Sequence, residues 1–283
     1  MQGVSGVRWG SDAPAIHNRM RPLTVQSGSD TYVASHMNGH HALIKYTGVD
    51  MSESNPERQF TIGYQDGNMT QDTTLNYYEG NAKHYYDGTV NINMTVLYTP
   101  FLTYMPTYAS ILDAGCGSGR DALYFASRGY QVTAFDYSPT LVNLATKLTG
   151  QEVLNLSFQD LAFEDQFNGI WACSSLMHVP LDEMHDALFK LSRAIKVDGV
   201  MYASFIYGTG EHNRHGRLFV DLDEDGCGEL IKLHPELAVI RCWKTSDLRP
   251  GRENEKWLNL LVRKARRSKR MTFLGVGQSP SPQ

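Results

Sequence analysis

The segment best suited to chemistry is a glycine-rich loop that follows a short apolar run. Residues Ile111–Ala114 are apolar except for Asp113, and glycines occupy alternate positions from Gly115 to Gly119. Glycine permits a tight turn and lets a ligand approach the backbone. A helix predicted at Gly119–Arg128 would begin here, and its first N–H groups and positive dipole end would face the loop. The segment therefore predicts a nucleotide-type ligand between a strand and a helix.

Two classes of ligand use such a loop, and the glycines alone do not separate them. Dinucleotide sites require G-x-G-x-x-G/A to seat a pyrophosphate. Counted from Gly115, the last position falls on Arg120 and fails; counted from Gly117, it falls on Ala122 and fits. Asp113 separates the classes, because a carboxylate would repel a pyrophosphate and attract the α-ammonium of a ligand that carries an amino acid. This favours S-adenosylmethionine.

Acidic residues also end the next two predicted strands. Asp136 ends the strand predicted at 131–135, where both ligand classes place a carboxylate that binds ribose hydroxyls. Asp160 closes the strand predicted at 153–158, where it can accept a hydrogen bond from an adenine amino group. Arg120 opposes the dipole at the start of its helix, which predicts a carboxylate on the ligand. Together they predict a ligand with adenosine and amino-acid parts.

Strands and helices alternate through the middle of the chain. Helices are expected at 74–87, 93–104, 119–128, 139–149 and 182–195, and strands at 111–114, 131–135, 153–158, 169–173 and 200–205. This rhythm predicts an α/β fold, a doubly wound, mostly parallel sheet with helices on both faces. After a helix at 228–234, strands at 238–245 and 256–263 predict an antiparallel hairpin.

The two ends of the chain differ from this middle part. Residues 1–68 are rich in Gly, Ser, Asn and His and show no sustained period, so we expect an extension that is largely disordered, with a short hairpin near 42–49 and 59–64. The folded domain is expected at 69–264. Residues 265–283 continue a basic run and are expected to form a disordered tail.

Four motifs in order, ILDAGCGSGRD, VTAFDYS, FQDL and GIWACSSLMHVP, resemble the successive motifs of class I S-adenosylmethionine-dependent methyltransferases. The resemblance spans about residues 74 to 264. It implies a Rossmann-like sheet of seven strands with an antiparallel last strand, and a segment before the first strand that closes over the cofactor. It implies that S-adenosylmethionine is bound by Asp113, Gly115, Cys116, Gly117, Gly119, Arg120, Asp136, Tyr137, Ser138, Gln159, Asp160, Leu161, Cys173 and Ser174. With YGTGE, GR-x-F-x-D and RPGRENEKWLN, the chain also resembles the small bacterial methyltransferases of the tellurite-resistance type.

The transferred methyl group is expected beside Cys173–Ser175, after the fourth strand. By resemblance, nucleic-acid methyltransferases carry an Asn/Asp-Pro-Pro-aromatic motif or a Pro-Cys nucleophile there, and this chain has neither. This argues against a nucleic-acid substrate. His178 is the candidate general base or substrate contact. The further candidates for substrate binding are Tyr78, Tyr86, Tyr207, Arg217 and Arg249.

Composition excludes several other classes of protein. The chain has 283 residues and a net charge of −4, so its overall charge requires no nucleic-acid or membrane partner. No apolar run approaches the ~20 residues that span a bilayer. The four cysteines form no CxxC pair, which fits reduced thiols in a cytosol and argues against a zinc ribbon. Residues 221–226 match half of a calcium loop, but Lys232 occupies its twelfth position, so no metal is expected.

These observations predict a methyltransferase with a small-molecule acceptor, such as a thiol or a metalloid oxyanion, because the segments inserted around the core are short. Three alternatives remain open. The shifted glycine match at Gly117 allows an NAD-dependent oxidoreductase. The basic run at 263–270 allows a methyltransferase of RNA or protein. A non-enzymatic sensor of S-adenosylmethionine would carry the same cofactor motifs.

Overall fold

The computed structural model describes residues 23–27, 30–37, 40–47, 61–63 and 68–266. The chain divides into two compact units, Met1–Gly67 and Asn68–Gln283. This division lies one residue before the expected domain start. The expected basic tail lies almost entirely outside the described residues.

The first unit contains a four-stranded antiparallel sheet, where we expected little regular structure. Its strands lie in chain order, β1 (Leu23–Ser27), β2 (Asp30–Met37), β3 (His40–Thr47) and β4 (Thr61–Gly63). The expected hairpin corresponds to β3 and β4, which pair with Leu43 opposite Gly63. The other two strands were missed, although Thr, Val and Tyr favour strands in short segments.

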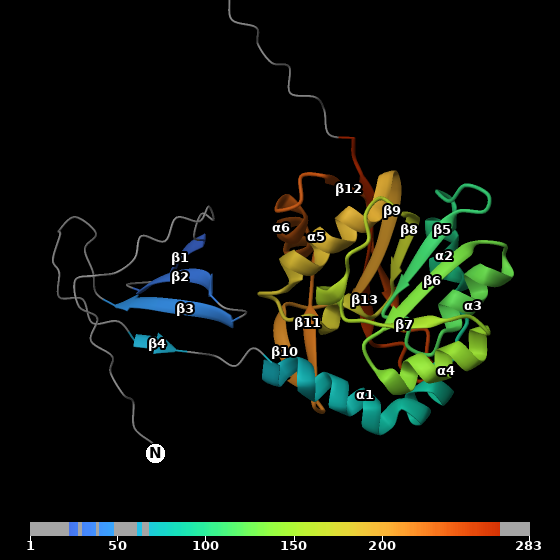
Figure 1. The fold of residues 1–283 in the computed structure, drawn as a ribbon, viewed down its shortest axis with the longest axis horizontal. Coiled ribbons are helices and arrows are strands. Elements are labelled where there is room, and N and C mark those ends of the chain that lie inside the picture. The colour runs from blue at the N-terminus through green and yellow to red at the C-terminus, as the bar shows by residue number, and fades with distance from the viewer. Residues whose placement is uncertain (1–22, 28–29, 38–39, 48–60, 64–67, 267–283) are drawn as a thin grey trace, which may run out of the picture. The chain divides into compact units, whose positions relative to one another are not determined.

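The second unit is built on a seven-stranded sheet (Figure 1). Its strands, in spatial order, are β12 (Leu237–Ser246), β13 (Lys256–Lys264), β9 (Ile195–Ile206), β8 (Phe167–Ala172), β5 (Ser110–Ala114), β6 (Gln131–Asp136) and β7 (Val153–Asn155). Only β13 among them runs antiparallel to its neighbours, and β9, β8, β5, β6 and β7 pair in parallel. The predicted fold, with its antiparallel last strand, is confirmed.

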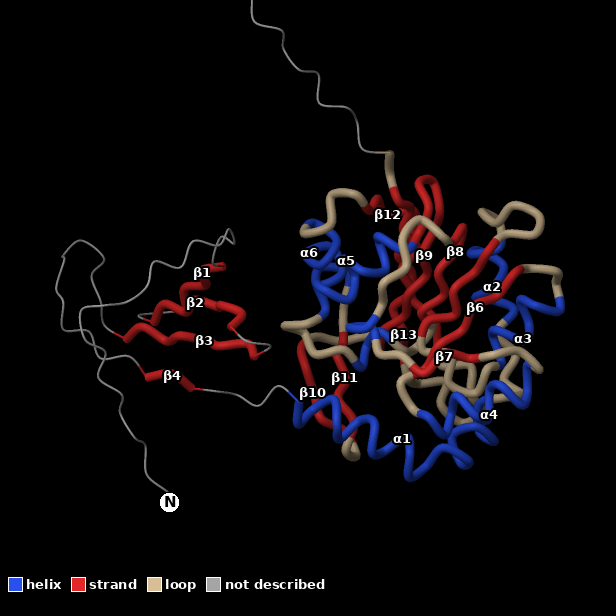
Figure 2. The backbone as a smooth tube through the Cα atoms, in the orientation of Figure 1, coloured by secondary structure: helices blue, strands red, loops and turns tan. Residues whose placement is uncertain are grey.

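Helices cover both faces of this sheet (Figure 2). They are α1 (Asn68–Thr89), α2 (Thr95–Leu102), α3 (Arg120–Ser127), α4 (Pro139–Thr149), α5 (Met184–Ala194) and α6 (Glu224–Lys232), with short 3₁₀ helices η1 (Phe158–Asp160) and η2 (Leu176–His178). Successive side chains of a strand point to opposite faces. In β9, Met201 and Ala203 accordingly pack in the core beneath α5, whereas Val200 and Tyr202 pack with α2 and α3.

Two local differences from the sequence predictions affect the site. The third strand is shorter than expected, because Ser157 and Asp160 form a capping box that begins η1 instead. An unpredicted hairpin, β10 (Gly210–Arg214) and β11 (Arg217–Asp221), is inserted between β9 and α6. His215 and Gly216 form its two-residue turn, both with positive φ.

The described part of the chain contains no helix long and apolar enough to cross a membrane. The four cysteines are all free thiols. The acidic run near β11 serves the fold itself, since Asp221 pairs with Arg214 and Asp223 caps α6 through the Gly226 N–H.

Candidate functional site

The glycine loop between β5 and α3 requires glycine for two reasons. Gly115, Gly117 and Gly119 have φ values of +72°, +55° and +79°, which L side chains rarely adopt. A Cβ on Gly115 would also lie 2.5 Å from Cβ of Ser175, and one on Gly119 would lie 3.0 Å from Cα of Ala145. The loop is therefore packed closely between the end of β8 and α4.

Asp136 ends β6 beside this loop. Its Oδ2 accepts a hydrogen bond from the Gly117 N–H at 2.8 Å, and its Oδ1 accepts one from the Ser138 N–H at 2.9 Å. Burial raises the pKa of Asp136, and these two N–H groups oppose the rise. Each carboxylate oxygen retains a further lone pair. Asp136 can therefore fix the loop and still accept hydroxyl hydrogen bonds from a ligand.

A cavity of about 720 Å³, open mouth included, lies at the carboxyl ends of β5 and β6. We call it the glycine-loop cavity. Its polar lining includes Asp136, Ser138, Gln159, Ser174 and His178, and its apolar lining includes Leu141, Leu156 and Phe158. Ligands of open α/β sheets bind at this edge. The cavity thus offers a carboxylate for ribose, exposed loop backbone and an apolar slot for a base, which fits an adenosine-bearing ligand.

The predicted residues around Asp160 divide between the cavity and its supports. Gln159 and Tyr137 line the glycine-loop cavity, whereas Asp160 and Leu161 do not. Oδ2 of Asp160 instead accepts hydrogen bonds from the Ser157 hydroxyl at 2.6 Å and its N–H at 3.1 Å, which lower the pKa of Asp160. The acid that we expected at an adenine amino group therefore caps η1.

Asp113 lies on β5 with only 2% of its surface exposed. It lines neither the glycine-loop cavity nor a second cavity that adjoins it. Burial raises its pKa well above the ordinary value, and the neighbouring Asp121 adds to the rise. Its Oδ2 is buried without a hydrogen-bond partner among the described residues. Asp113 thus lies outside the lining of both cavities, and its attraction for a ligand ammonium stays a prediction. Cys116, also buried, packs with Ala122 in the core beside it.

Arg120 faces away from the glycine-loop cavity, into a second one. Its Nε and Nη2 donate to Asp121 at 2.6 and 2.9 Å, and the same carboxylate accepts from Tyr98 at 2.5 Å and Trp171 at 2.8 Å. Although burial disfavours its charge, Asp121 raises the pKa of Arg120. Arg120 thus belongs to a polar cluster in which Asp121 is fully hydrogen-bonded, and its contact with a cofactor carboxylate stays a prediction.

The second cavity encloses about 1420 Å³, open mouth included. We call it the arginine cavity, because it is lined by Arg120, Arg214, Arg217, Arg249 and Arg252. Its walls come from α1, α2, the β10–β11 hairpin and the β12–β13 connection. Tyr78, Tyr85 and Ser174 line both cavities. The two cavities therefore meet at these three residues.

His178 and Tyr78 form a hydrogen-bonded pair at this junction. The His178 Nδ1 lies 2.6 Å from the carbonyl oxygen of Leu218, and its Nε2 lies 2.9 Å from the hydroxyl of Tyr78. A carbonyl can only accept, so Nδ1 carries the proton and Nε2 accepts from Tyr78. Burial lowers the pKa of His178 to about 4 and raises that of Tyr78. Both groups are neutral at pH 7.

Cys173 and Ser174 lie at the same junction. Ser174 has a φ of +55°, and its N–H donates to the Ser204 hydroxyl at 2.8 Å. Cys173 lines the arginine cavity, and burial raises the pKa of its thiol to about 12. The thiol is therefore protonated, and the predicted position of both residues beside the transferred methyl group stays a prediction.

Two of the proposed substrate contacts lie elsewhere. Tyr86 lines neither cavity, whereas Tyr85, seven residues after Tyr78 and hence on the same helical face, lines both. Its hydroxyl lies 2.9 Å from where a Cβ on Gly117 would be. Tyr207 is 37% exposed, and its hydroxyl donates to Glu224 at 3.1 Å. The helical period could have identified Tyr85 in place of Tyr86, because it puts Tyr85 on the same face of the helix as Tyr78.

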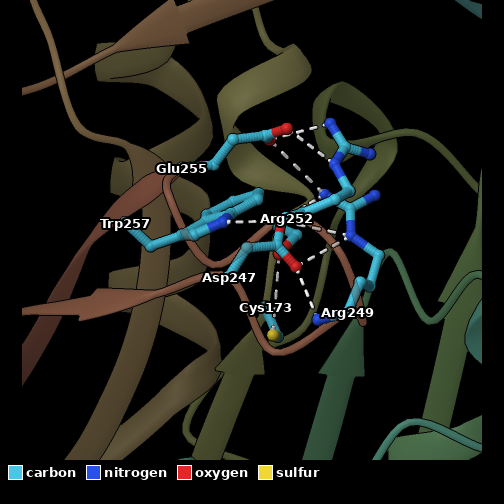
Figure 3. Close-up of polar contacts among 7 residues, drawn as sticks. Cys173, Asp247, Arg249, Arg252, Glu255 and Trp257 are labelled. Carbon is cyan, nitrogen blue, oxygen red and sulfur yellow. Dashed lines mark hydrogen bonds and ion pairs between the residues drawn. The ribbon is translucent and has the colours of Figure 1, made fainter.

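Arg249 belongs to a polar network on the wall of the arginine cavity (Figure 3). Its guanidinium pairs with Asp247 through Nε and Nη2, and Trp257 donates to the same carboxylate at 3.1 Å. Arg252 pairs with Glu255 at 2.7 Å. Sequence reasoning found Arg249 but missed these partners, which lie in the turn-rich segment between β12 and β13.

Helix α1 is tied across both cavities. Glu79 accepts hydrogen bonds from the Ser138 hydroxyl, from the Thr140 hydroxyl at 2.6 Å and from the Thr140 N–H at 3.1 Å. Burial disfavours the Glu79 charge, but these donors lower its pKa. Five residues earlier on α1, the Thr74 hydroxyl accepts a hydrogen bond from the Leu218 N–H at 2.9 Å. The segment before the first core strand thus contributes to the walls of both cavities, and its closure over a cofactor stays a prediction.

Comparison with known proteins agrees with this arrangement. Residues 112–203 match the sequence family described as a methyltransferase domain. Malonyl-[acyl-carrier protein] O-methyltransferase of Salmonella typhimurium is 33% identical over 96 residues, which are 33% of this chain and 38% of that protein. The chain spans less than half the length of the curated relatives it matches.

Two solved structures share the fold over a larger part of the chain. The 1,6-didemethyltoxoflavin-N1-methyltransferase of Burkholderia thailandensis, with its substrate and S-adenosylhomocysteine bound, has a TM-score of 0.59, 20% identity and coverage of 82% of this chain and 99% of its own. The [4+2]-cyclase SpnF has a TM-score of 0.54, 16% identity and coverage of 70% and 96%. The family match indicates a methyltransferase domain over residues 112–203, and the two solved structures show that its fold extends over a larger part of the chain.

Proposed function

We propose that this protein transfers a methyl group from S-adenosylmethionine to a small-molecule acceptor. The observation that carries the proposal is the junction of the two cavities at Tyr78, Tyr85 and Ser174. One cavity has the glycine loop and Asp136, which suit the cofactor. The other has room and polar groups for an acceptor. A cofactor methyl group held at the junction would be within reach of an acceptor in the second cavity.

The residues of the glycine-loop cavity fit the cofactor. Asp136 would bind the ribose hydroxyls, and the apolar side chains of Leu141 and Phe158 would pack on the adenine. The close approach of the loop backbone depends on Gly115 and Gly117, where a Cβ would fill space already taken by Ser175 and Tyr85. When bound, the cofactor supplies an electrophilic sulfonium methyl group.

The protein's own contribution is to position the acceptor, exclude water and manage one proton. Holding the acceptor atom ~3–3.5 Å from the methyl carbon can supply much of the rate enhancement. The hydroxyl of Tyr78 can accept a proton from a neutral acceptor while its own proton passes to Nε2 of His178. The Leu218 carbonyl, hydrogen-bonded to Nδ1, keeps the ring oriented for this transfer. An acceptor that is already an anion would need no proton transfer.

A small acceptor is supported by the construction of the arginine cavity. The cover over it consists of α1 and the β10–β11 hairpin, which are tied together by the bond between Leu218 and Thr74. Such a covered cavity suits a compact molecule better than a polymer. The Burkholderia neighbour, which has 1,6-didemethyltoxoflavin bound, is consistent with this proposal. The resemblance to tellurite-resistance-type enzymes adds thiols and metalloid oxyanions to the acceptors worth screening.

The test is calorimetric titration of S-adenosylhomocysteine into the wild type and into Asp136→Ala. We expect micromolar binding that Asp136→Ala weakens by roughly 1–3 kcal/mol, since a hydrogen-bonding charge is lost. Asp186→Ala, which removes an exposed carboxylate on α5 that pairs with Lys190, is the matched control and should bind like wild type. A well-folded wild type that does not bind would refute the proposed cofactor site.

Binding alone does not establish transfer, because the cyclase SpnF has the same fold. The second arm is therefore a screen for S-adenosylhomocysteine release with small thiols, hydroxylated aromatics, organic acids, selenite and tellurite. Turnover of tRNA or protein, with none of the small acceptors consumed, would contradict the small-molecule part of the proposal and leave the cofactor site intact.

A further inference from the structure

Four of the five arginines that line the arginine cavity form ion pairs with four carboxylates, of which Glu255 contacts both Arg252 and Arg249. The pairs are Arg120–Asp121, Arg214–Asp221, Arg249–Asp247 and Arg252–Glu255. The fifth, Arg217, has no carboxylate within ion-pair distance in the described part of the chain. The cavity thus contains one positive charge without a matching negative charge.

Aromatic rings hold this fifth arginine in place. The guanidinium of Arg217 lies 4.2 Å from the ring centroid of Tyr77, 5.0 Å from that of Phe219 and 5.9 Å from that of Tyr78. Its Nε is buried and has no hydrogen-bond partner among the described residues. Cation–π contacts orient a guanidinium without neutralising it. Arg217 therefore remains a preoriented donor.

The position of Arg217 links it to the junction of the cavities. It precedes Leu218, whose carbonyl orients His178, and it lies beside Tyr78, which lines both cavities. Its positive charge and hydrogen bond oppose the effect of burial on the Tyr78 pKa. An anion bound by Arg217 would therefore lie next to the point of methyl transfer.

We infer that the methyl acceptor is a small organic acid with one negative charge, and that its carboxylate binds Arg217. This inference rests on the proposed function. A planar guanidinium matches a carboxylate with two parallel N–H···O bonds, and a partly buried charge is stabilised by such a partner. The apolar part of the acid would pack on the remaining wall, which includes Met94, Leu97, Met177, Ile206 and Leu248.

The experiment uses the full chain saturated with S-adenosylhomocysteine. Three matched pairs of probes are titrated: benzoate and benzamide, phenylacetate and phenylacetamide, and anthranilate and anthranilamide. Each pair has nearly the same shape and differs by one charge. We expect the acids to bind at least about tenfold more tightly than their amides, because a hydrogen-bonded ion pair is gained.

Three variants assign that preference to one residue. Arg217→Gln should remove the preference for acids while retaining the affinity for S-adenosylhomocysteine. Arg217→Lys keeps the positive charge but lacks the two parallel N–H donors of the guanidinium, so it should retain a reduced preference for acids. Arg128→Gln is the control, since Arg128 also stacks on a tyrosine, at 5.0 Å from the Tyr124 ring, and lines neither cavity. It should behave as wild type.

The possible failures are distinguishable. A wild type that binds S-adenosylhomocysteine but shows no preference for the acids, or binds none of the six probes, overturns this inference alone. An undiminished acid preference in Arg217→Gln also overturns it. If Arg217→Gln does not fold, equal acid preference in Arg217→Lys and wild type overturns the bidentate contact. A folded wild type that does not bind S-adenosylhomocysteine overturns the proposed function itself.

Discussion

Substituting alanine at two glycines separates backbone strain from steric crowding in the glycine loop. Gly115 and Gly129 both have positive φ, +72° and +87°. They differ in surroundings, because a Cβ on Gly129 would meet nothing within 4 Å, whereas one on Gly115 would lie 2.5 Å from Cβ of Ser175. Gly129→Ala therefore introduces strain alone, and Gly115→Ala adds a clash.

The magnitudes follow from these two contributions. The left-handed conformation costs a residue with a Cβ about 1–2 kcal/mol, which is the loss of unfolding free energy expected for Gly129→Ala. Overpacking adds about 1–3 kcal/mol. Ser175 cannot easily yield, because its hydroxyl donates to the Ala114 carbonyl at 2.6 Å. We therefore expect Gly115→Ala to lose about 2–5 kcal/mol in total.

Urea denaturation of both variants measures these losses, and titration of S-adenosylhomocysteine shows whether the loop still binds. Gly115→Ala should weaken binding, whereas Gly129→Ala should not. Combining Gly115→Ala with Ser175→Gly should recover part of the lost stability, since the clashing Cβ is gone. Equal destabilisation by the two single alanine variants, or no recovery in the double variant, would refute the steric part of this reasoning.

Three further predictions concern the cover and the junction. Tyr78→Phe removes the donor to His178 and should lower kcat at least about tenfold for acceptors that must lose a proton, with little change for anionic ones, as steady-state kinetics would show. The pKa of His178 falls from 6.5 unfolded to about 4 folded, so the unfolded chain binds more protons between these values. The free energy of unfolding should therefore fall as pH drops from 7 to 5, by about 2 kcal/mol more in wild type than in His178→Gln. Equal losses of unfolding free energy in denaturation experiments would contradict this. Glu79→Gln weakens the bonds that tie α1 to α4, and should cost about 1 kcal/mol of unfolding free energy and expose α1 to limited proteolysis, which an unchanged digestion pattern would disprove.

The fold of the second unit could be predicted because its signals are local. A glycine-rich turn after an apolar strand and regular alternation of strands with amphipathic helices require no knowledge of distant contacts. The β10–β11 hairpin gave no such signal. Strand β10 (GEHNR) is exposed or half-exposed along its whole length, so it has no apolar alternation by which to recognise a strand.

The same distinction applies to the acids at the strand ends. Asp136, Asp113 and Asp160 look equivalent in sequence, but only Asp136 lines a cavity. Side chains alternate along a strand, so Asp113 points into the packing between β5 and α3. Asp160 ends a 3₁₀ helix and forms a capping box with its N-cap residue, Ser157. A shift of one residue along a strand thus reverses the face of the sheet to which an acid points. A sequence motif does not specify that shift.

The arginine cavity shows why the acceptor is the least predictable part of the site. Sequence reasoning named Arg217 and Arg249 on equal terms, and both line the cavity. Only pairing separates them, because Asp247, two residues from Arg249, neutralises it, whereas Arg217 has aromatic neighbours. The charge available to a substrate is therefore what remains after intramolecular pairing. Which charge remains unpaired is a property of tertiary structure. Arg214 pairs with Asp221 across a hairpin, and this pair occupies the one carboxylate of β11, so that it does not pair with Arg217.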